Sequence, residues 1–317
     1  MTLGWVADGS VDSIRRALSM VAPDLADDAI ALREGLGESD PQWWSSSALV
    51  GGEAVVKFAW SRPAAERLWN EAQILRTFAD RQVELRLPPV VAVADDPVLV
   101  VTRFVAGRPL TIEMVRSADR AEVEEIGAEL ASFLTNMHRP ETLASARRAI
   151  SWFPTPPQPA TTEELRTRFG AWIRTDQQRH LLFWCDWADE VLARPGGPVL
   201  VHGDLHGHNQ LWHPDRLQLR AVVDFETCSV ADLEYDFRCL PAEGGPDLAL
   251  LTATASHYRR LSGTDVALDR VMAWHIRASL GDALWRSEAG VHLPGGGTPS
   301  EWMDAINARM DAFGMRA

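Results

Sequence analysis

The chain has 317 residues, of which 46% are hydrophobic and 24% charged, the composition of an ordinary globular protein with room for two domains. The formal net charge is −13, from 31 basic and 44 acidic side chains, and this argues against nucleic-acid binding because phosphate contacts need a basic surface. We expect neither a signal peptide nor a membrane span, since the N-terminus has no basic start and no run of about 18 apolar residues occurs.

The first third of the chain predicts a helix and a small sheet. Gly51-Gly52 between two apolar runs is a hairpin signal, and Pro63 is permitted in the first turn of a helix. In chain order we expect a helix over residues 11–33, two strands within 48–60, a helix over 63–80 and a strand over 98–104.

From about residue 108 the pattern becomes mostly helical. Thr161 and Glu164 have the spacing of a capping box that opens a helix, and the Pro-rich segment 153–159 before it predicts a surface loop. Further helices are expected over 122–137, 247–261, 268–287 and 299–313, with a loop at 295–297.

Three polar side chains follow two short apolar runs in the middle of the chain. Asp204 comes just after the run 199–201, Asn209 lies five residues later, and Asp224 directly follows the run 221–223. Phosphoryl transfer needs one carboxylate that orients an attacking hydroxyl and accepts its proton. It also needs an Asn and an Asp that hold magnesium against the phosphates.

The spacing H-x-D-x-x-x-x-N, with D-F about twenty residues later, is the kinase catalytic-loop and metal-loop pattern. Gly203 stands where protein kinases usually carry Arg, and Glu226 stands where they carry Gly. With these two departures the segment resembles the aminoglycoside phosphotransferase and choline kinase group of small-molecule kinases.

The resemblance implies an α+β, bilobal protein-kinase-like fold. Its smaller N-lobe, expected over residues 1–104, is an antiparallel sheet with one key helix, and the larger, mostly helical C-lobe is expected over 105–317. It also implies an ATP- and Mg²⁺-dependent O-phosphotransferase that acts on a small-molecule hydroxyl.

Within this pattern each motif residue has an expected role. Asp204 is the catalytic carboxylate, and His202 holds the catalytic loop through backbone hydrogen bonds. Asn209 and Asp224 are oxygen ligands for magnesium. Glu226 either adds a second metal contact or forms a salt bridge or helix cap, and we weigh these alternatives equally.

Lys57 interrupts an apolar strand and therefore needs partners for its ammonium group. Kinase chemistry supplies the α- and β-phosphates of ATP and a glutamate of the next helix. Periodicity selects Glu71, because it lies three residues after Leu68 and four before Leu75, on the core-facing side of that helix.

The phosphate-covering loop has no G-x-G-x-x-G pattern before Lys57; Gly35-Leu-Gly37 and a serine run stand there instead. We expect the hydroxyls and backbone amides of Ser45, Ser46 and Ser47 to contact phosphate. The run 101–104, with Thr102 and Phe104, resembles the hinge whose backbone recognises adenine.

In this group the acceptor lies between the catalytic loop and the C-terminal helices. An acidic surface would attract cationic small molecules, although many proteins are acidic simply for solubility, which is the favoured interpretation of the charge alone. The acceptor candidates, each with a surface or core role as its alternative, are Asp282, Trp285, Glu288, Glu301 and Trp302. Asp232 and Asp236 are expected to cap a helix and brace the catalytic loop rather than touch substrate. The acceptor is therefore expected to be cationic or sugar-like, such as an aminoglycoside-like or amino-sugar molecule, which makes antibiotic resistance one possible role.

Several alternatives stay open. The chain could be a housekeeping metabolite kinase of the choline or sugar type, or a nucleotide-binding regulator without turnover, although the motif set argues against the latter. A protein kinase is disfavoured because no A-P-E sequence follows Asp224. A transition-metal cluster of His202, His206, His208 and His213 is also disfavoured, and we expect His206 and His208 to face the cleft or solvent.

The three cysteines fit neither metal pairs nor a disulfide framework, which predicts a reducing, cytoplasmic setting. The sequence leaves open whether the protein is a monomer or a homodimer.

Overall fold

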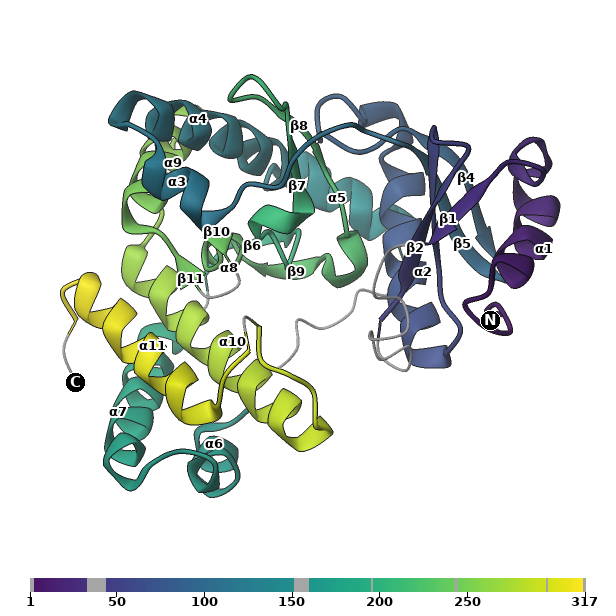
Figure 1. Cartoon of the computed structure of the whole chain (residues 1–317). Helices are drawn as coiled ribbons and strands as arrows, with labels where there is room; N and C mark the ends of the chain where they lie inside the picture. Colours follow the sequence, from purple (N-terminus) through teal and green to yellow (C-terminus); the bar gives the residue numbers. More distant parts are fainter. Residues whose placement is uncertain are drawn as a thin grey trace. The chain divides into compact units, whose positions relative to one another are not determined.

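An antiparallel sheet with strand order β1-β2-β3-β5-β4 dominates the N-terminal part of the chain (Figure 1). The computed structural model describes residues 3–32, 44–150, 160–194, 196–242, 245–294 and 296–315. The predicted features at 35–37 and 153–159, and Gly295 of the predicted loop, lie outside these residues. The strands are β1 (Ile30–Leu32), β2 (Ser46–Val50), β3 (Ala54–Phe58), β4 (Val90–Asp95) and β5 (Val98–Arg103).

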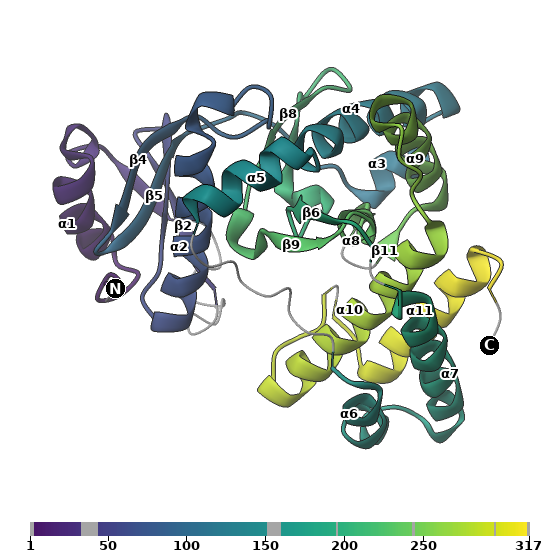
Figure 2. The same cartoon turned by 180° about the vertical axis from the view of Figure 1, so that it is seen from behind.

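The alternation of side chains along β3 determines which residues lie on each face of this sheet. Val56 and Phe58 are fully buried in a cluster with Ile14 and Leu18 of α1 (Val11–Val21). Because side chains alternate along a strand, Lys57 points to the opposite face, where α2 (Arg62–Thr77) packs. Figures 1 and 2 show α1 and α2 on opposite faces of the sheet.

The β2–β3 hairpin confirms the predicted turn. Gly51 and Gly52 both have left-handed backbones, with φ of +59° and +73°, and the hairpin register pairs Ser47 with Lys57. Glycine adopts this conformation without a steric penalty, which explains why two glycines stand here.

The chain divides into two compact units, each made of three separate segments of the sequence. Unit 1 consists of residues 1–108, 139–154 and 209–229, and unit 2 of residues 109–138, 155–208 and 230–317. Besides the sheet, α1 and α2, unit 1 contains the short helices η1 (Pro23–Leu25), η2 (Ala79–Arg81) and η5 (Phe225–Thr227), together with α5 (Pro140–Ala149), β7 (Gln210–Trp212) and β8 (Leu219–Val222).

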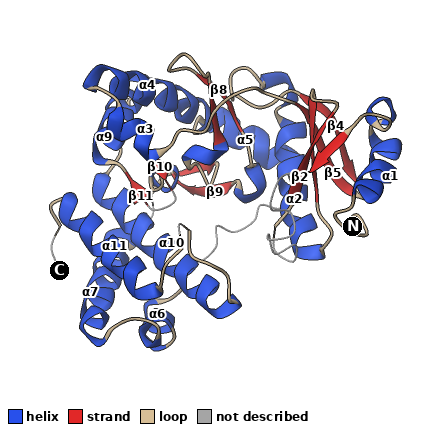
Figure 3. Cartoon of the chain, in the orientation of Figure 1, coloured by secondary structure: helices blue, strands red, loops and turns tan. Residues whose placement is uncertain are grey.

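Unit 2 is mostly helical (Figure 3). Its longer helices are α4 (Arg120–Met137), α7 (Thr175–Leu192), α9 (Leu248–Ser262), α10 (Leu268–Ala289) and α11 (Pro299–Ala312). Shorter helices are α3 (Ile112–Ser117), α6 (Thr162–Thr167), α8 (Glu234–Phe237) and η3 (Phe169–Ala171). Short strands are β6 (Pro198–Val201), β10 (Pro241–Ala242) and β11 (Gly245–Pro246); η4 (Gly207–Asn209) and β9 (Ser229–Asp232) run across the unit boundary.

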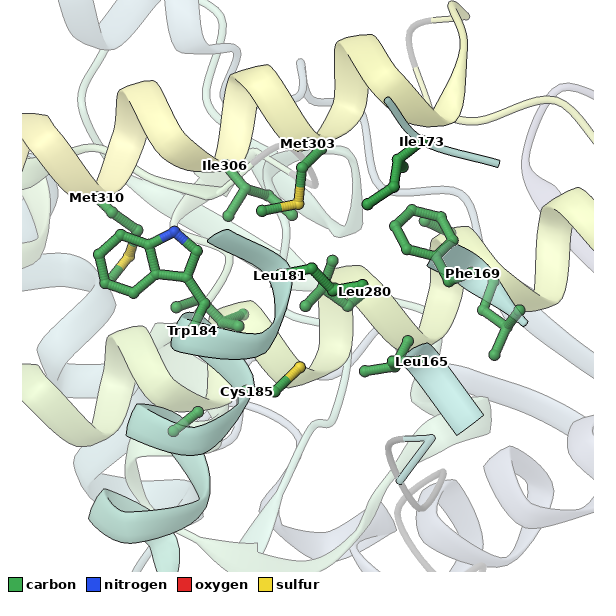
Figure 4. Packing of buried hydrophobic residues seen from close by; sticks show 14 of the residues in the cluster. Leu165, Phe169, Ile173, Leu181, Trp184, Cys185, Leu280, Met303, Ile306 and Met310 are labelled. Atoms are coloured by element: carbon green, nitrogen blue, oxygen red, sulfur yellow. The ribbon is translucent and has the colours of Figure 1, made fainter. Parts of the chain in front are cut away.

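One hydrophobic cluster holds the C-terminal helices of unit 2 together. Trp184 of α7 packs with Leu280 of α10 and with Met303 and Ile306 of α11, and the Trp184 Nε1–H donates to Asn307 Oδ1 at 2.8 Å (Figure 4). A buried indole that keeps its hydrogen bond loses no polar interaction on folding, so this tryptophan serves as a core residue.

One predicted element was wrong, and one strand was missed. The helix expected over 11–33 ends at Val21, because Pro23 starts a separate turn and residues 30–32 form β1. Strand β4, next to the consecutive prolines Pro88 and Pro89, was missing from the predicted order. The capping box of Thr161 and Glu164 and the C-terminal helices are confirmed.

Candidate active site

In unit 1, three carboxylates surround the ammonium group of Lys57. Its Nζ lies 2.5 Å from Glu71 Oε2, 3.0 Å from Asp224 Oδ1 and 3.0 Å from Glu226 Oε1. Glu71, which periodicity selected, is therefore the residue of α2 that contacts Lys57. A second cation, Arg67, has its Nε 3.5 Å from Glu226 Oε2.

This cluster carries more negative than positive charge. Burial raises the pKa of Glu71, and the charges of Asp224 and Glu226 raise it further against the opposing pull of Lys57. Burial alone would lower the pKa of Lys57, but the three carboxylates raise it well above its usual value. A divalent cation would relieve this excess of carboxylate charge.

The donor chemistry fits a hard cation. Among the described residues, Glu71, Asp224 and Glu226 are the acidic group whose ligand atoms all lie within 4.8 Å of one another. Carboxylate oxygens are the ligands that Mg²⁺ prefers, usually together with phosphates and water. Asp224 is 43% exposed and the most accessible of the three, whereas Glu71 and Glu226 are buried and committed to Lys57.

The β7–β8 hairpin brings the two predicted magnesium ligands together. Gln210 pairs with Val222, and the Val223 N–H donates to the Asn209 carbonyl at 2.9 Å, so Asn209 lies next to the residue that precedes Asp224. Asp224 itself has a left-handed backbone with φ of +69°. Aspartate tolerates this conformation better than most residues, and such outliers are concentrated at functional sites.

Asn70 of α2 contacts the turn after Asp224, and the sequence did not predict this. Its buried Nδ2 lies 3.0 Å from the Glu226 carbonyl, 2.9 Å from the Cys228 carbonyl and 3.3 Å from the Phe225 carbonyl. Because Asn70 is the neighbour of Glu71, one turn of α2 contacts both Lys57 and the backbone of the turn after Asp224.

We expect Asn70→Ala to raise the Mg²⁺ concentration for half-maximal activity several-fold. The change leaves buried carbonyls without their donor, which costs about 1–3 kcal/mol locally and loosens the turn that presents Asp224. A magnesium titration of activity measures the shift, and Gln73→Ala on the same helix is the control. An unchanged magnesium dependence in the Asn70 variant contradicts the expectation.

In unit 2, Asp204 lies between two histidines of its own loop. The Asp204 N–H donates to His202 Nδ1 at 3.2 Å, and Asp204 Oδ2 lies 3.5 Å from His206 Nε2. His206 Nδ1 accepts the His208 N–H at 3.3 Å, so Nε2 carries the ring proton toward Asp204. The surrounding protein partly desolvates Asp204, whose side chain keeps 42% of its surface exposed, and this would raise its pKa; the hydrogen bond with His206 and the electrostatic interactions with His206, Arg238 and His202 instead lower it to about 2.

His206 itself is buried beside Asp204 rather than facing solvent, whereas His208 is exposed. The loop has no room for a side chain at Gly207, where a Cβ would lie 1.7 Å from the Leu110 carbonyl oxygen. His202 and His206 both contact groups of their own loop: His202 Nδ1 accepts the Asp204 N–H, and His206 Nε2 lies near the Asp204 carboxylate.

Asp236 braces the loop that carries Asp204, as predicted. Its fully buried carboxylate accepts the His202 N–H and the Gly203 N–H, each at 2.9 Å, and His138 Nε2 at 3.1 Å. Asp232 does not share this role: it accepts the Gly196 N–H and contacts Arg270. The expected helix cap was also wrong, since neither side chain caps α8.

Asp236→Asn is expected to lower the free energy of unfolding by about 1–3 kcal/mol at pH 7, because an amide cannot accept at both oxygens' positions. Burial would raise the pKa of Asp236, but His138 and the backbone donors lower it below its usual value. The lowered pKa means that this stabilisation is present above about pH 4 and fades as the pH falls further.

Urea unfolding at pH 7 and pH 3 therefore should show a difference between wild type and Asp236→Asn that narrows in acid. Asp265→Asn is the control, since this exposed aspartate of unit 2 pairs with Arg259 rather than with the loop around Asp204. A difference that stays constant or widens in acid would refute the assigned charge state.

The other predicted nucleotide-binding residues lie in or beside the sheet. Ser46 and Ser47 belong to β2, and the Ser45 hydroxyl hydrogen-bonds Glu226 Oε1. Thr102 is buried within β5. Phe104 follows the end of β5 and is half exposed, and its N–H donates to the Glu53 carbonyl at 2.7 Å.

The predicted acceptor residues have different local partners. Asp282 forms an ion pair with Arg286 at 2.8 Å. Burial raises the pKa of Asp282, and the negative charge of Asp204 raises it further. Trp285 lies next to Arg286, whose guanidinium carbon is 5.8 Å from its ring. Glu288 forms an ion pair with Arg168, and Glu301 closes the capping box of α11 with Thr298. Trp302 donates to the Ser279 carbonyl at 3.1 Å.

No helix of the described residues has the length and apolarity needed to cross a membrane.

Comparisons with known proteins cover most of the chain. The profile of the phosphotransferase enzyme family matches residues 35–285. The viomycin phosphotransferase of Streptomyces vinaceus is 25% identical over 249 residues, which cover 75% of this chain and 81% of that protein.

Solved structures agree in fold. The GDP complex of wild-type aminoglycoside 2'-phosphotransferase-IIIa superposes with a TM-score of 0.71 at 17% identity, over 96% of this chain and 98% of that one. The macrolide 2'-phosphotransferase MphH of Brachybacterium faecium, an apoenzyme, superposes with a TM-score of 0.60 at 18% identity, over 88% and 93%. The predicted bilobal, protein-kinase-like α+β fold is confirmed.

Proposed function

Because the chain belongs to the phosphotransferase enzyme family, we propose that it transfers the γ-phosphoryl group of ATP, with Mg²⁺, to a hydroxyl group of a cationic or sugar-like small molecule. The observation that carries the proposal is the charge arrangement around Lys57, where three carboxylates face one ammonium in unit 1. That excess of oxygen ligands suits a magnesium nucleotide.

Each unit contributes different groups to the proposed reaction. In unit 1, Lys57 is proposed to bind the α- and β-phosphates while Glu71 holds it in place, and Asn209 and Asp224 are proposed to bind the metal. Bound magnesium would neutralise charge on the phosphates. Glu226 fits its salt-bridge alternative, since it is buried against Lys57 and Arg67.

In unit 2, Asp204 is proposed to orient the acceptor hydroxyl and accept its proton. Its pKa of about 2 keeps it ionised at neutral pH, so that it acts mainly by positioning and by stabilising developing positive charge. His202 and Asp236 hold the loop that presents it.

The acceptor class follows from charge and from relatives. The chain has a net charge of −13, and Asp282 places a carboxylate close enough to Asp204 for their charges to interact. A hydroxyl-bearing molecule with amino groups suits these carboxylates. The matched relatives are named for phosphorylating viomycin, aminoglycosides and macrolides, and we propose an antibiotic or amino sugar of this kind as acceptor.

A panel of aminoglycosides, viomycin, macrolides, amino sugars and choline tests the proposal, with ATP and GTP as separate donors. We expect nucleotide consumption together with a phosphate mass gain on at least one acceptor, lost without Mg²⁺. Transfer confined to choline or a simple sugar would establish the metabolite-kinase alternative. Nucleotide binding without transfer to any acceptor would establish a regulator and overturn the proposal.

A further inference from the structure

The peptide group that joins Gly203 to Asp204 is held at both of its polar ends. Its N–H, from Asp204, donates to His202 Nδ1 at 3.2 Å, and its C=O, from Gly203, accepts Arg238 Nη2 at 2.6 Å. Gly203 has a left-handed backbone with φ of +87°, a region where glycine moves with little steric resistance. The orientation of this peptide therefore depends on its hydrogen bonds.

Arg238 is well placed to fix that carbonyl. It follows α8, and its Nη1 donates to the Tyr235 carbonyl at 2.7 Å, which satisfies an acceptor at the end of this short helix. A planar guanidinium with several donors can bind both carbonyls at once. One side chain thus ties the end of α8 to the residue before Asp204.

The guanidinium rests on an aromatic support. Its carbon lies 3.7 Å from the centre of the Tyr235 ring, and that ring meets Trp274 of α10 edge-on, with centres 5.2 Å apart. Trp274 in turn donates Nε1–H to Asp232 at 3.2 Å. Stacking on a buried ring removes the rotamer freedom that a long side chain otherwise keeps.

The loop itself lacks an arginine where the protein-kinase pattern has one, since position 203 is Gly. We propose that Arg238 is a positioning residue for phosphoryl transfer, which fixes the Gly203–Asp204 peptide from outside the loop and so aims the Asp204 carboxylate. The inference rests on the proposed catalytic role of Asp204, and it assigns Arg238 no contact with substrate.

Electrostatics act in the same direction. Desolvation opposes ionisation of Asp204, but its hydrogen bond with His206 and its electrostatic interactions with His206, Arg238 and His202 overcome this, so that its pKa falls to about 2. Removing the guanidinium would therefore weaken both the geometry and the charge balance of the carboxylate.

Arg238→Met is the main test, because methionine keeps an unbranched chain over the Tyr235 ring but has no donors and no charge. We expect kcat to fall about 10–100-fold, the size expected from a misplacement of roughly 1 Å, while KM for the nucleotide changes less than about threefold. Arg238→Lys should recover part of kcat, because an ammonium can still donate to the Gly203 carbonyl.

Arg277→Met is the matched control. Arg277 is also an arginine of unit 2 with few exposed atoms, and it donates to the Ala160 carbonyl and the Thr162 hydroxyl rather than to the catalytic loop. We expect Arg277→Met to lower the melting temperature but to keep kcat within a few-fold of the wild-type value.

Amide hydrogen exchange separates this inference from the proposed function, because it needs no turnover. Arg238→Met should speed exchange in the peptide that covers residues 202–206, at the Asp204 N–H above all, while α4 and α9 stay protected. If wild type transfers phosphate to no acceptor yet this exchange response is present, the proposed function fails and the positioning of the loop stands.

Wild-type kcat together with unchanged exchange in Arg238→Met overturns the inference. If Arg238→Met does not fold, Tyr235→Leu tests the same chain of contacts, since it removes the ring but keeps the guanidinium. A smaller fall in kcat, with nucleotide KM unchanged, supports the inference, and kcat equal to wild type overturns it.

Discussion

Asp204→Asn is expected to lower kcat at least about 100-fold while nucleotide affinity stays within a few-fold of wild type. Asparagine has the shape of aspartate but cannot accept a proton, so the change removes the proposed chemical role and leaves the loop contacts of the backbone in place. Nucleotide binding should survive because the Lys57 cluster belongs to unit 1 and contains no atom of Asp204.

The measurement pairs steady-state kinetics with calorimetric nucleotide titration. Asp189→Asn is the control, because Asp189 is an aspartate of unit 2 with a similarly exposed carboxylate, 51% against 42%, that pairs with Arg277. Turnover of Asp204→Asn within a few-fold of wild type would remove Asp204 from the chemistry.

The pH profile gives a second reading of the same residue. Since the pKa of Asp204 is lowered to about 2, its carboxylate is ionised throughout the range in which the protein can be assayed. Titration of Asp204 should therefore cause no fall in log kcat between about pH 8 and pH 5. If the wild type does lose activity toward acid in this range, the same loss should remain in Asp204→Asn. A loss that this substitution abolishes would show that the carboxylate titrates in the working range.

Asp224→Asn is expected to weaken magnesium-nucleotide binding at least about 10-fold, with a smaller effect on the metal-free nucleotide. The reason is charge: a neutral amide replaces the most exposed carboxylate of the Lys57 cluster. Asparagine is the sharper choice than alanine, because it tolerates the left-handed backbone at this position, where alanine would add strain of about 1–2 kcal/mol.

Calorimetry with and without Mg²⁺ measures the coupling between metal and nucleotide, which should shrink in the variant. Asp95→Asn is the control, since this unit 1 aspartate is similarly exposed, 38% against 43%, and pairs with Arg76. A wild-type difference between the two titrations would show that Asp224 is not a metal ligand.

Residues with a strong local pattern were predictable from the sequence. Lys57 in an apolar strand demanded a partner, and helical spacing singled out Glu71, which the structure places 2.5 Å away. The Gly51-Gly52 turn followed from glycine's conformational freedom. In each case the signal is local: Leu68 and Leu75 select Glu71 within its own helix, and the glycines themselves mark the turn.

Residues that act across long sequence separations were not predictable. Asn70 reaches carbonyls more than 150 positions later, and Arg238 reaches Gly203 from a separate segment. Their partners are backbone carbonyls, which every residue type has, so no pattern in the sequence identifies them.

For Glu301 a local signal, the capping-box spacing, was present in the sequence, but the prediction assigned this residue to acceptor binding instead. Thr298 and Glu301 have the T-x-x-E spacing of a capping box, and the structure shows that box at the start of α11. The same spacing had correctly predicted the box at Thr161 and Glu164. The carboxylate of Glu301 is thus already bound to Thr298.

The three-piece composition of unit 1 has a consequence for biosynthesis. Its sheet is complete on the nascent chain by residue 108, but the hairpin that carries Asp224 ends about 120 residues later. At about 5–20 residues per second, a ribosome needs roughly 6–24 seconds to deliver that piece. Until then Glu71 is the one acidic residue of the Lys57 cluster that has been synthesised, and the side of α2 that later contacts Phe225 lacks its partner, so unit 1 cannot complete this part of its packing before its last piece emerges.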